Sequence, residues 1–437
     1  MENICDKIKT RVKNFDIYLQ KLESETVNFE NNKLKLVDRR LEKGYGIRLI
    51  KDNKIGFSAS NNFGNIDSTI ENALKLSAFG EKCYFEFPNK RFDFKDLKIF
   101  SDNITSINSK KMIELGKHLL SLLSSLDNDI KTNVIVEKNI IKNELINSSS
   151  LNLKERKTRF SITGWIFKAE ENNFIEIWEQ EDLKENEDLP NLINKIFERI
   201  KFLFNSAKNV TKIEPGYYPV FFTPKSFSTI LSMLIKSFDG NLIYKKISFF
   251  TDKKGRKFFK KPVTILDDPL KIGYPYSRNF DGDGIKSEPI YLIEKGVIKQ
   301  FLLDIQTAGK LKSVSNGHSV RSYVSLPSPG HTNIFFTVED KSFVENREKI
   351  IKGIRKGILI DQFLGAGQSN ILAGEFSVNI DLGFLIENGE IVGRIKDCMI
   401  AGNLFELLND IEKIDNSPLY YGSIETPGVL VSKLPVK

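Results

Sequence analysis

Two acidic side chains lie close together in this 437-residue sequence, a few residues after an arginine. Asp281 and Asp283 lie in a glycine-containing segment, 280–284, shortly after Arg278. Paired carboxylates can carry out acid–base chemistry or bind a hard cation, and an arginine can hold a carboxylate through two hydrogen bonds. Asp-Gly is also a common turn sequence, so a tight turn is the simpler interpretation of the pair, and a surface position is the simpler one for Arg278. We keep all three residues as candidates for a binding cleft.

The sequence contains three histidines. His118 lies beside Leu119 in a segment with helical spacing, where we expect a partly buried structural side chain. His318 and His331 fall in glycine-containing turns, and their separation matches no short zinc motif. We therefore predict no metal site from this pair and keep both residues as further cleft candidates.

Other catalytic motifs are missing from the sequence. The three cysteines, Cys5, Cys83 and Cys398, form no Cys-x-x-Cys pair, so neither a disulfide framework nor a thiolate zinc site is predicted. No Gly-x-Ser-x-Gly nucleophile elbow is present. Segment 365–370 lacks the spacing and the lysine of a phosphate-binding loop, and it predicts a tight turn between strands.

The composition favours a cytoplasmic globular protein. The formal net charge is +8 and the pI is about 9.0, but the lysines are scattered among acidic residues, and the densest basic stretch, 253–257, fits a solvated loop. Nucleic-acid-binding signatures are missing, so nucleic acid is disfavoured as a partner. We expect no membrane segment, because no apolar run approaches ~18 residues, and no signal peptide is recognisable.

The sequence predicts a mixed α/β domain over residues 1–210 as the first part of the fold that positions the candidate residues. The turn pairs Asn31-Asn32 and Asp52-Asn53 predict two hairpins. Apolar spacing predicts helices at 66–78, at 109–126 and from 190 to near 210, and a further strand pair at 160–168 and 174–178.

Residues 211–437 predict a second, β-rich domain. A strand at 216–222 leads into a central helix at 224–238, with Thr223 as its N-cap and Pro224 in its first turn. Short strand-like runs separated by Gly, Asp and Pro follow over 245–337, and another helix is expected at 343–357. The expected fold class is therefore α+β, a mixed α/β N-terminal domain followed by a C-terminal domain rich in antiparallel sheet.

Short motifs spread along the chain resemble, in order and spacing, those of the TldD/PmbA family. They lie at 44–49, 56–60, 216–220, 280–284, 307–311, 374–377, 386–391 and 400–404. The resemblance runs from about residue 15 to residue 433 and implies the same α+β fold. Catalytic members of the family are zinc metalloproteases that cut unfolded or extended peptides. In two-subunit forms a metal-bearing TldD-type chain pairs with a metal-free PmbA-type chain, also called TldE. An older label for the family is modulator of DNA gyrase.

The family's zinc motif is the feature that this sequence lacks. In catalytic members the resemblance places His-Glu-x-x-x-His on the central helix, which supplies zinc ligands and a base for the bound water. Aligned on Gly240, these positions fall on Leu231, Ser232 and Lys236, which can replace neither ligands nor base. The position of a further cysteine ligand falls near Ser417. We therefore expect no metal or cofactor in this chain, and zinc only in a TldD-type partner.

The resemblance implies a PmbA/TldE-like, non-catalytic subunit that pairs with a TldD-type chain or with itself and handles unfolded peptides. Segment 421–430 resembles the ending of that branch. The peptide-cleft candidates are then Arg278, Asp281, Asp283, His318 and His331. A self-sufficient homodimeric peptide-binding protein or metal-independent peptidase stays open, as does, less favoured, a DNA- or gyrase-binding protein. The sequence leaves open the natural substrate, the cleavage preference, the existence of a catalytic partner and the choice between homodimer and heterodimer.

Overall fold

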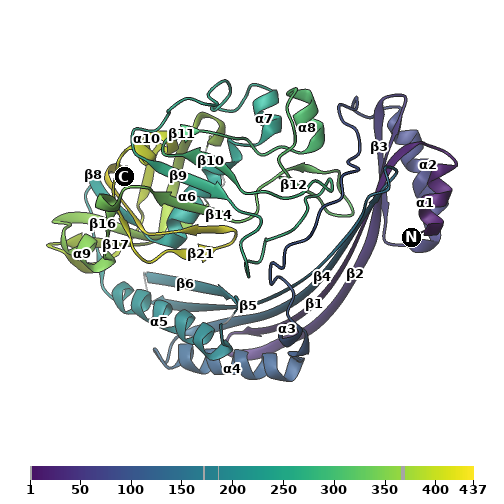
Figure 1. Ribbon diagram of the computed structural model, residues 1–437. Coiled ribbons are helices and arrows are strands. Elements are labelled where there is room, and N and C mark those ends of the chain that lie inside the picture. The colour runs from purple at the N-terminus through teal and green to yellow at the C-terminus, as the bar shows by residue number, and fades with distance from the viewer. Residues whose placement is uncertain (1, 171–172, 186, 366–369) are drawn as a thin grey trace.

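A curved antiparallel sheet of long strands forms the N-terminal half of the computed structural model, which describes residues 2–170, 173–185, 187–365 and 370–437 (Figure 1). The strand order is β3-β2-β1-β4-β5-β6. The strands are β1 (Asn14–Glu30), β2 (Lys33–Lys51), β3 (Lys54–Ser60), β4 (Lys131–Asn147), β5 (Asn152–Glu170) and β6 (Asn173–Asp182). All of these pairs are antiparallel, and the strands of 17 to 19 residues give the sheet its length and curvature.

Two tight turns set the register of this sheet, as the sequence predicts. Asn31 and Asn32 connect β1 to β2 with φ of 49° and 66°, and Asp52 and Asn53 connect β2 to β3 with φ of 50° and 58°. Two successive positive φ angles define a type I′ turn, whose twist matches that of the flanking strands, and Asn and Asp tolerate this conformation better than other non-glycine residues.

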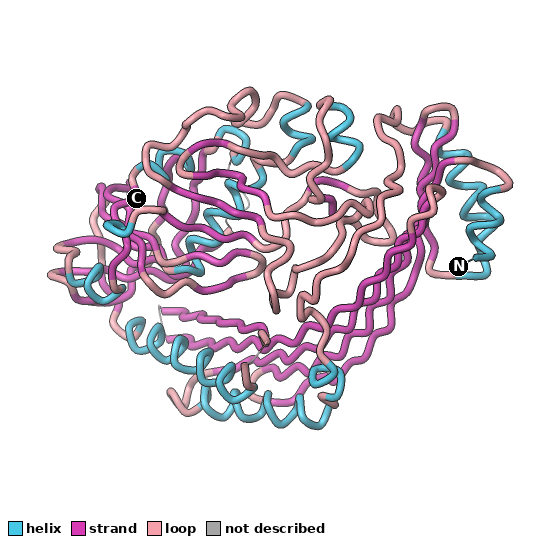
Figure 2. Tube along the Cα trace, viewed as in Figure 1, coloured by secondary structure: helices cyan, strands magenta, loops and turns pink. Residues whose placement is uncertain are grey.

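Helices cover this sheet at its two ends (Figures 1 and 2). At one end α4 (Ser109–Ser124) and α5 (Leu189–Ala207) bury their apolar faces against β4, β5 and β6. Each begins at a capping side chain, Asn108 for α4 and Asp188 for α5, which accepts a backbone N–H of the first turn. At the other end α1 (Glu2–Lys9) and α2 (Ile66–Ser77) pack on β1 and β2. The short helix α3 (Asp102–Ser106) precedes α4.

The C-terminal half is built on two larger sheets. Among the described residues, nine strands form a mixed sheet: β7 (Val210–Thr211), β8 (Gly216–Phe222), β15 (Val344–Glu345), β16 (Lys356–Leu364), β17 (Glu375–Glu387), β18 (Glu390–Ile395), β19 (Met399–Asn403), β20 (Ile411–Asp415) and β23 (Val429–Val436). Six strands form the second sheet: β9 (Val263–Asp267), β10 (Ile290–Glu294), β11 (Val297–Ile298), β14 (Ile334–Val338), β21 (Leu419–Tyr421) and β22 (Ile424–Thr426). A small ribbon joins β12 (Ser319–Val320) to β13 (Ser328–Pro329).

The central helix α6 (Pro224–Lys236) lies between these two sheets. Thr223 caps it by accepting the backbone N–H of Ser226, and proline occupies the first turn, where a missing N–H costs nothing. Phe227, Ile230 and Leu234 bury its apolar stripe against strands of both sheets. Short helices complete this half: α7 (Gly240–Tyr244), α8 (Ile305–Lys310), α9 (Arg347–Lys352) and α10 (Leu404–Asn409).

One of the hydrophobic clusters joins the two halves. It contains the buried faces of α4 and α5 together with Phe221 of β8, Leu359 of β16 and Phe384 of β17. Helix α5 therefore lies between the curved sheet and the nine-stranded sheet, and each half completes the packing of the other.

The α+β fold class is confirmed, but two elements differ from the prediction. Strand β4 was not predicted. The helix predicted at 343–357 is wrong in length: α9 covers only Arg347–Lys352, and the chain then enters β16, which pairs in parallel with β8. Strand pairing within the large sheet therefore overrides the helical spacing of this segment.

The turn predicted at 365–370 includes residues 366–369, which lie outside the described residues. None of the helices in the described ranges combines the length and apolar character that crossing a bilayer requires.

Candidate functional site

A small pocket lies along the polar face of α6. Its volume is about 260 Å³. The helix contributes three hydroxyl groups to its wall, those of Ser228, Thr229 and Ser232, because positions four residues apart lie on one helix face. The opposite wall comes from β6 and from the turn between β21 and β22. The lining residues are Trp178, Lys225, Ser228, Thr229, Ser232, His331, Tyr421, Gly422, Ser423 and Ile424.

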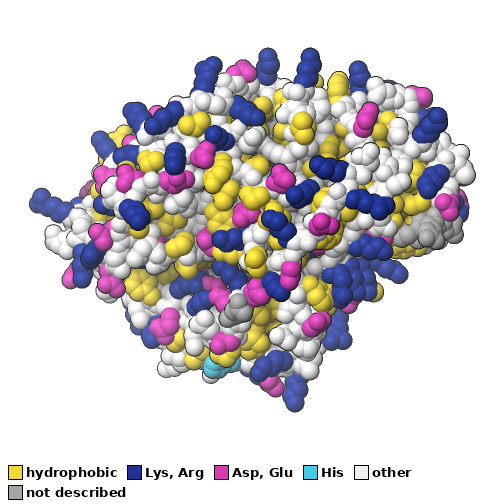
Figure 3. Space-filling view, in the orientation of Figure 1, with side chains coloured by type: hydrophobic (Ala, Val, Ile, Leu, Met, Phe, Trp, Pro, Cys, Tyr) yellow, Lys and Arg dark blue, Asp and Glu magenta, His cyan; other side chains and the backbone are white. Residues whose placement is uncertain are grey.

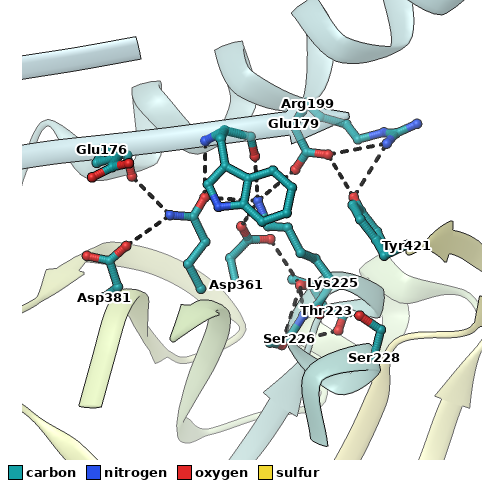
Figure 4. A network of polar contacts seen from close by, with 12 residues as sticks. Glu176, Glu179, Arg199, Thr223, Lys225, Ser226, Ser228, Asp361, Asp381 and Tyr421 are labelled. Atoms are coloured by element: carbon teal, nitrogen blue, oxygen red, sulfur yellow. Dashed lines mark hydrogen bonds and ion pairs between the residues drawn. The ribbon is translucent and has the colours of Figure 1, made fainter. Parts of the chain in front are cut away.

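Lys225 closes one end of this pocket from the first turn of α6 (Figure 4). Its ammonium Nζ lies 2.9 Å from Oε1 of Glu179 and 2.7 Å from Oδ2 of Asp361. It also donates to the backbone carbonyl of Trp178 at 2.7 Å and to the side-chain amide oxygen of Gln362 at 2.9 Å. The lysine therefore joins a strand of the N-terminal sheet, β6, to α6 and β16 of the C-terminal half.

The charges of this cluster are buried and matched. The side chains of Lys225, Glu179 and Asp361 are all at most 5% exposed. Burial alone would lower the pKa of Lys225, but the two carboxylates outweigh it and raise that pKa above its ordinary value, so the ammonium stays charged. Tyr421 donates its hydroxyl to Glu179 at 2.7 Å, and Arg199 of α5 lies 3.4 Å from the same carboxylate. Every charge in the cluster thus has a partner of opposite sign.

A histidine and a serine face each other across the same pocket. Nε2 of His331 lies 2.8 Å from Oγ of Ser423, a hydrogen-bond distance. Burial lowers the pKa of His331 below its ordinary value, which keeps the imidazole neutral at pH 7. The segment that carries His331 is fixed by Asp267, which accepts the backbone N–H and the hydroxyl of Thr332. Ser423 follows Gly422, whose φ of 62° places the serine at the tip of the β21–β22 hairpin.

The positions predicted to have lost the zinc motif do not fit a zinc site. Leu231 is fully buried in the core between the sheets, and only Ser232 of the three lines the pocket, with its hydroxyl donated to the carbonyl of Thr229 at 2.7 Å. Lys236 is exposed at the last turn of α6, and Ser417 lies outside the pocket in the loop before β21. The pocket offers one imidazole among hydroxyl groups, whereas a catalytic zinc needs about three imidazole, thiolate or carboxylate ligands. Throughout the described residues, no group of three or more His, Cys, Asp or Glu side chains is placed to hold a metal.

The predicted acidic pair lies elsewhere, in a buried junction between the two halves. Asp281 accepts the backbone N–H groups of Asp283 and Ile285, both at 2.9 Å, which is the geometry of a side-chain-stabilised turn. Asp283 pairs at 2.8 Å with the guanidinium of Arg48 from β2. Arg48 also pairs with Asp16 of β1. Asp16 and Asp283 therefore join the two halves through Arg48, whereas Asp281 stabilises a turn. None of the three lines the α6 pocket.

Arg278 and His318 lie near this junction rather than in the α6 pocket. Arg278 donates to the carbonyl of Gly317 at 3.4 Å. His318 is fully buried, and burial lowers its pKa to about 3, so it is neutral. Its Nδ1 lies 2.9 Å from the carbonyl of Asn316. Of the five predicted cleft residues, the structure brings only His331 to the pocket on α6.

The raised pKa values of two buried acids near this junction, Asp281 and Asp304, predict that the free energy of unfolding falls as pH rises. Burial, then repulsion by Asp283, raises the pKa of Asp281 to about 7 and that of Asp304 to about 6. A folded-state pKa above the unfolded value stabilises the fold at low pH, and this contribution is lost as pH rises through the folded pKa. We expect the free energy of unfolding to fall between about pH 4, near the pKa of an unfolded Asp, and about pH 7, by up to about 1.4 kcal/mol per pH unit for each group that titrates.

Asp304→Asn tests this expectation, because asparagine keeps the N-cap of α8, where Asp304 accepts the backbone N–H of Thr307 at 2.6 Å. Urea denaturation at several pH values should show a shallower decline for this variant than for the wild type. Equal slopes would mean that Asp304 does not titrate in this range.

Two family models match this chain. The family model described as PmbA/TldA metallopeptidase C-terminal domain matches residues 215–437, and the one described as PmbA/TldA metallopeptidase domain 1 matches residues 15–77. The chain belongs to the PmbA/TldD family.

Similar proteins extend over nearly the whole chain. An uncharacterized protein of Methanocaldococcus jannaschii is 27% identical over 398 residues, 87% of this chain and 89% of that protein. A metalloprotease PmbA homolog of Buchnera aphidicola is 24% identical over 433 residues, 96% of this chain and 92% of that protein. The crystal structure of TldE from Thermococcus kodakarensis is 22% identical, covers 100% of this chain and 99% of that chain, and superposes with a TM-score of 0.88. A putative modulator of a DNA gyrase from Thermotoga maritima is 20% identical, covers 100% of both chains and has a TM-score of 0.87. At these identities the two solved structures show the fold.

Most residues of the site were not among the sequence candidates. Lys225, Tyr421 and Ser423 line the pocket from α6, β21 and the β21–β22 turn. Glu179 of β6 and Asp361 of β16 do not line it but hold the ammonium of Lys225. The available signal was Lys225 itself, a lysine in the first turn of a helix with a strongly apolar stripe. A positive charge is disfavoured at a helix N-terminus, so it requires acidic partners from elsewhere in the fold.

Proposed function

We propose that this chain is a metal-free, PmbA/TldE-like subunit of a cytoplasmic TldD-type metalloprotease complex acting on unfolded or extended peptides. In this role the α6 pocket holds part of a peptide, and a TldD-type chain supplies the zinc and the hydrolysis. The observation that supports the proposal most is the composition of the pocket wall. At the family's metal-binding helix, this chain presents hydroxyl groups and a lysine already neutralised by two carboxylates.

The shape and chemistry of the pocket suit a segment of peptide. Its volume of about 260 Å³ accommodates one or two side chains, and the Trp178 and Tyr421 rings supply apolar surface. The hydroxyls of Ser228 and Ser232 can exchange hydrogen bonds with peptide amides without demanding a particular sequence. With its charges internally matched, the pocket does not select charged side chains.

Zinc content and reconstitution test this proposal. We expect fewer than about 0.1 zinc per chain in protein purified without chelators or a His-tag, because the site lacks a ligand set. Adding this chain to a TldD-type chain should speed cleavage of an unfolded peptide, and Ser232→Trp, which fills the pocket, should reduce that gain. Lys236→Met, on the exposed side of the same helix, is the matched control. About one zinc per chain, or a catalytic chain equally fast alone, would contradict the proposal.

A metal-independent peptidase is the second candidate, favoured by the Ser423–His331 pair. Neutral His331 can accept the hydroxyl proton of Ser423 as the serine oxygen attacks an acyl carbonyl, and the protonated imidazole can then donate that proton to the leaving amine. Water would release the acyl group from the serine in a second step.

A fluorophosphonate probe separates the two candidates. The second candidate requires labelling at Ser423 that survives EDTA and disappears in His331→Ala and in Ser423→Ala. Ser228→Ala, which removes a different hydroxyl from the same pocket, should leave that labelling unchanged. An unlabelled wild-type chain would overturn the second candidate.

A further inference from the structure

Part of strand β2 forms an open edge of the N-terminal sheet. Strand β3 pairs with β2 only over residues 45–51, whereas β1 pairs with β2 along residues 33–50. Residues 33–44 therefore have a strand neighbour on one side only among the described residues. A strand edge of this length offers a row of unpaired backbone N–H and C=O groups, and natural proteins usually keep such edges short or covered.

The side chains of this edge combine exposed apolar groups with positive charge. Leu34, Leu36, Val37 and Leu41 are 45%, 47%, 41% and 61% exposed. Residues 33–44 carry five basic and two acidic side chains, a net charge of +3. Figure 3 shows Lys and Arg side chains gathered at the lower right, over the long N-terminal strands. Charge alone would protect an edge from pairing, but four exposed aliphatic side chains favour a partner that also buries apolar surface.

A groove of about 380 Å³ lies beside this edge. It is lined by Lys21, Glu23, Ser24, Glu25, Arg39, Arg40, Leu41, Thr105, Lys138 and Ile140. The carboxylate of Glu25 is shared by Arg39, at 3.1 Å, and Lys138, at 2.9 Å, so two cations face one anion. Arg39 is 69% exposed and Arg40 is 79% exposed, which leaves both guanidinium groups within reach of a ligand.

We infer that this edge and its groove bind an extended acidic peptide segment, which adds to the sheet as a further strand. Backbone hydrogen bonds to the edge would give affinity, and an acidic side chain entering the groove would give selectivity. Nucleic acid would use the positive charge but neither the unpaired backbone groups nor the exposed leucines. The inference rests on the proposed peptide-handling function and adds a second, charge-selective surface to it, formed by strands and residues distinct from those of the α6 pocket.

Fluorescence anisotropy with twelve-residue peptides tests the inference. A peptide alternating Glu with Val is expected to bind about tenfold more tightly than its Lys counterpart, and added salt should reduce that difference. The double substitution Arg39→Glu/Arg40→Glu should weaken binding of the acidic peptide by at least about tenfold. Lys254→Glu/Lys257→Glu reverses two exposed charges in a distant basic loop and should change its affinity by less than about twofold.

Two N-methylated series of the acidic peptide test strand addition directly, because alternate amides of an added strand point toward the sheet edge. One series carries N-methyl groups at the odd positions and the other at the even positions. The series whose methyl groups face the sheet edge should lose binding, and the other should keep it. Equal binding of acidic and basic peptides, indifference to Arg39→Glu/Arg40→Glu, equal behaviour of the two methylated series, or displacement by single-stranded DNA at equal concentration would each overturn the inference. A neutral unfolded peptide that binds while these tests fail would leave the proposed function standing. Failure of every peptide to bind would overturn both.

Discussion

Replacing Arg48 with methionine is expected to lower the free energy of unfolding by about 3–5 kcal/mol. The Arg48 side chain is 2% exposed and forms ion pairs with Asp16 and Asp283, whose side chains are at most 1% exposed. Its guanidinium also lies 4.8 Å from the ring centre of Phe85. Methionine can fill much of the volume but cannot neutralise the carboxylates. Asp16 keeps Arg321 at 3.0 Å, so the main cost is the unpaired charge of Asp283.

Urea denaturation followed by tryptophan fluorescence and circular dichroism would measure the loss. Arg40→Met is the matched control, because Arg40 pairs with Asp38 in the same strand but is 79% exposed, and such pairs contribute at most about 1 kcal/mol. If both variants unfold at the same urea concentration, the buried pair does not hold the two halves together.

Lys225→Met is expected to lower the free energy of unfolding by a similar amount, about 3–5 kcal/mol. The reason is the same: the substitution leaves a buried carboxylate unpaired, here in the Lys225 cluster between β6 and β16. Without the ammonium, the carboxylate of Asp361 stays buried, and its remaining hydrogen-bond donor among the described residues is the hydroxyl of Thr223, at 3.0 Å. Glu179 is less affected, since Tyr421 and Arg199 remain beside it.

A second substitution separates charge from packing in this cluster. Lys225→Met/Asp361→Asn removes the uncompensated carboxylate and should recover at least half of the lost stability, because the amide oxygen of the substituted side chain can still accept from Thr223. Lys236→Met, at the exposed end of α6, should change stability by less than about 0.5 kcal/mol. A double variant no more stable than Lys225→Met would assign the loss to packing of the lysine stem.

Local signals predicted the elements that carry the site. The strand at 216–222 and the helix that begins after Thr223 are found as β8 and α6, since a cap, a proline and an apolar stripe all lie within a few residues of one another. Strand β4 was missed although its β-branched run at 134–136 is a strand signal. Its middle carries polar and charged side chains, and Lys138 there is buried because it pairs with Glu25 of β1, a partner more than a hundred residues away.

The site itself depends on distant pairings that no local pattern encodes. Lys225 meets Glu179, which is 46 residues earlier, and Gln362, which is 137 residues later. The acidic pair at 281 and 283 resembled a catalytic group by residue type, but burial and an arginine from β2 make it a structural junction. Residue type and spacing thus suggested possible chemistry, and three-dimensional pairing determined which groups share a pocket.

The position of α5 between the curved sheet and the nine-stranded sheet has a consequence for how the molecule opens. Because Phe221, Leu359 and Phe384 complete the core of α4 and α5, separating the halves would expose aliphatic and aromatic surface on both sides. Amide hydrogens of α5 and β8 are then protected by the same global opening event, rather than by two independent ones. We therefore expect the two halves, whose topology divides near residue 210, to unfold together as one cooperative unit.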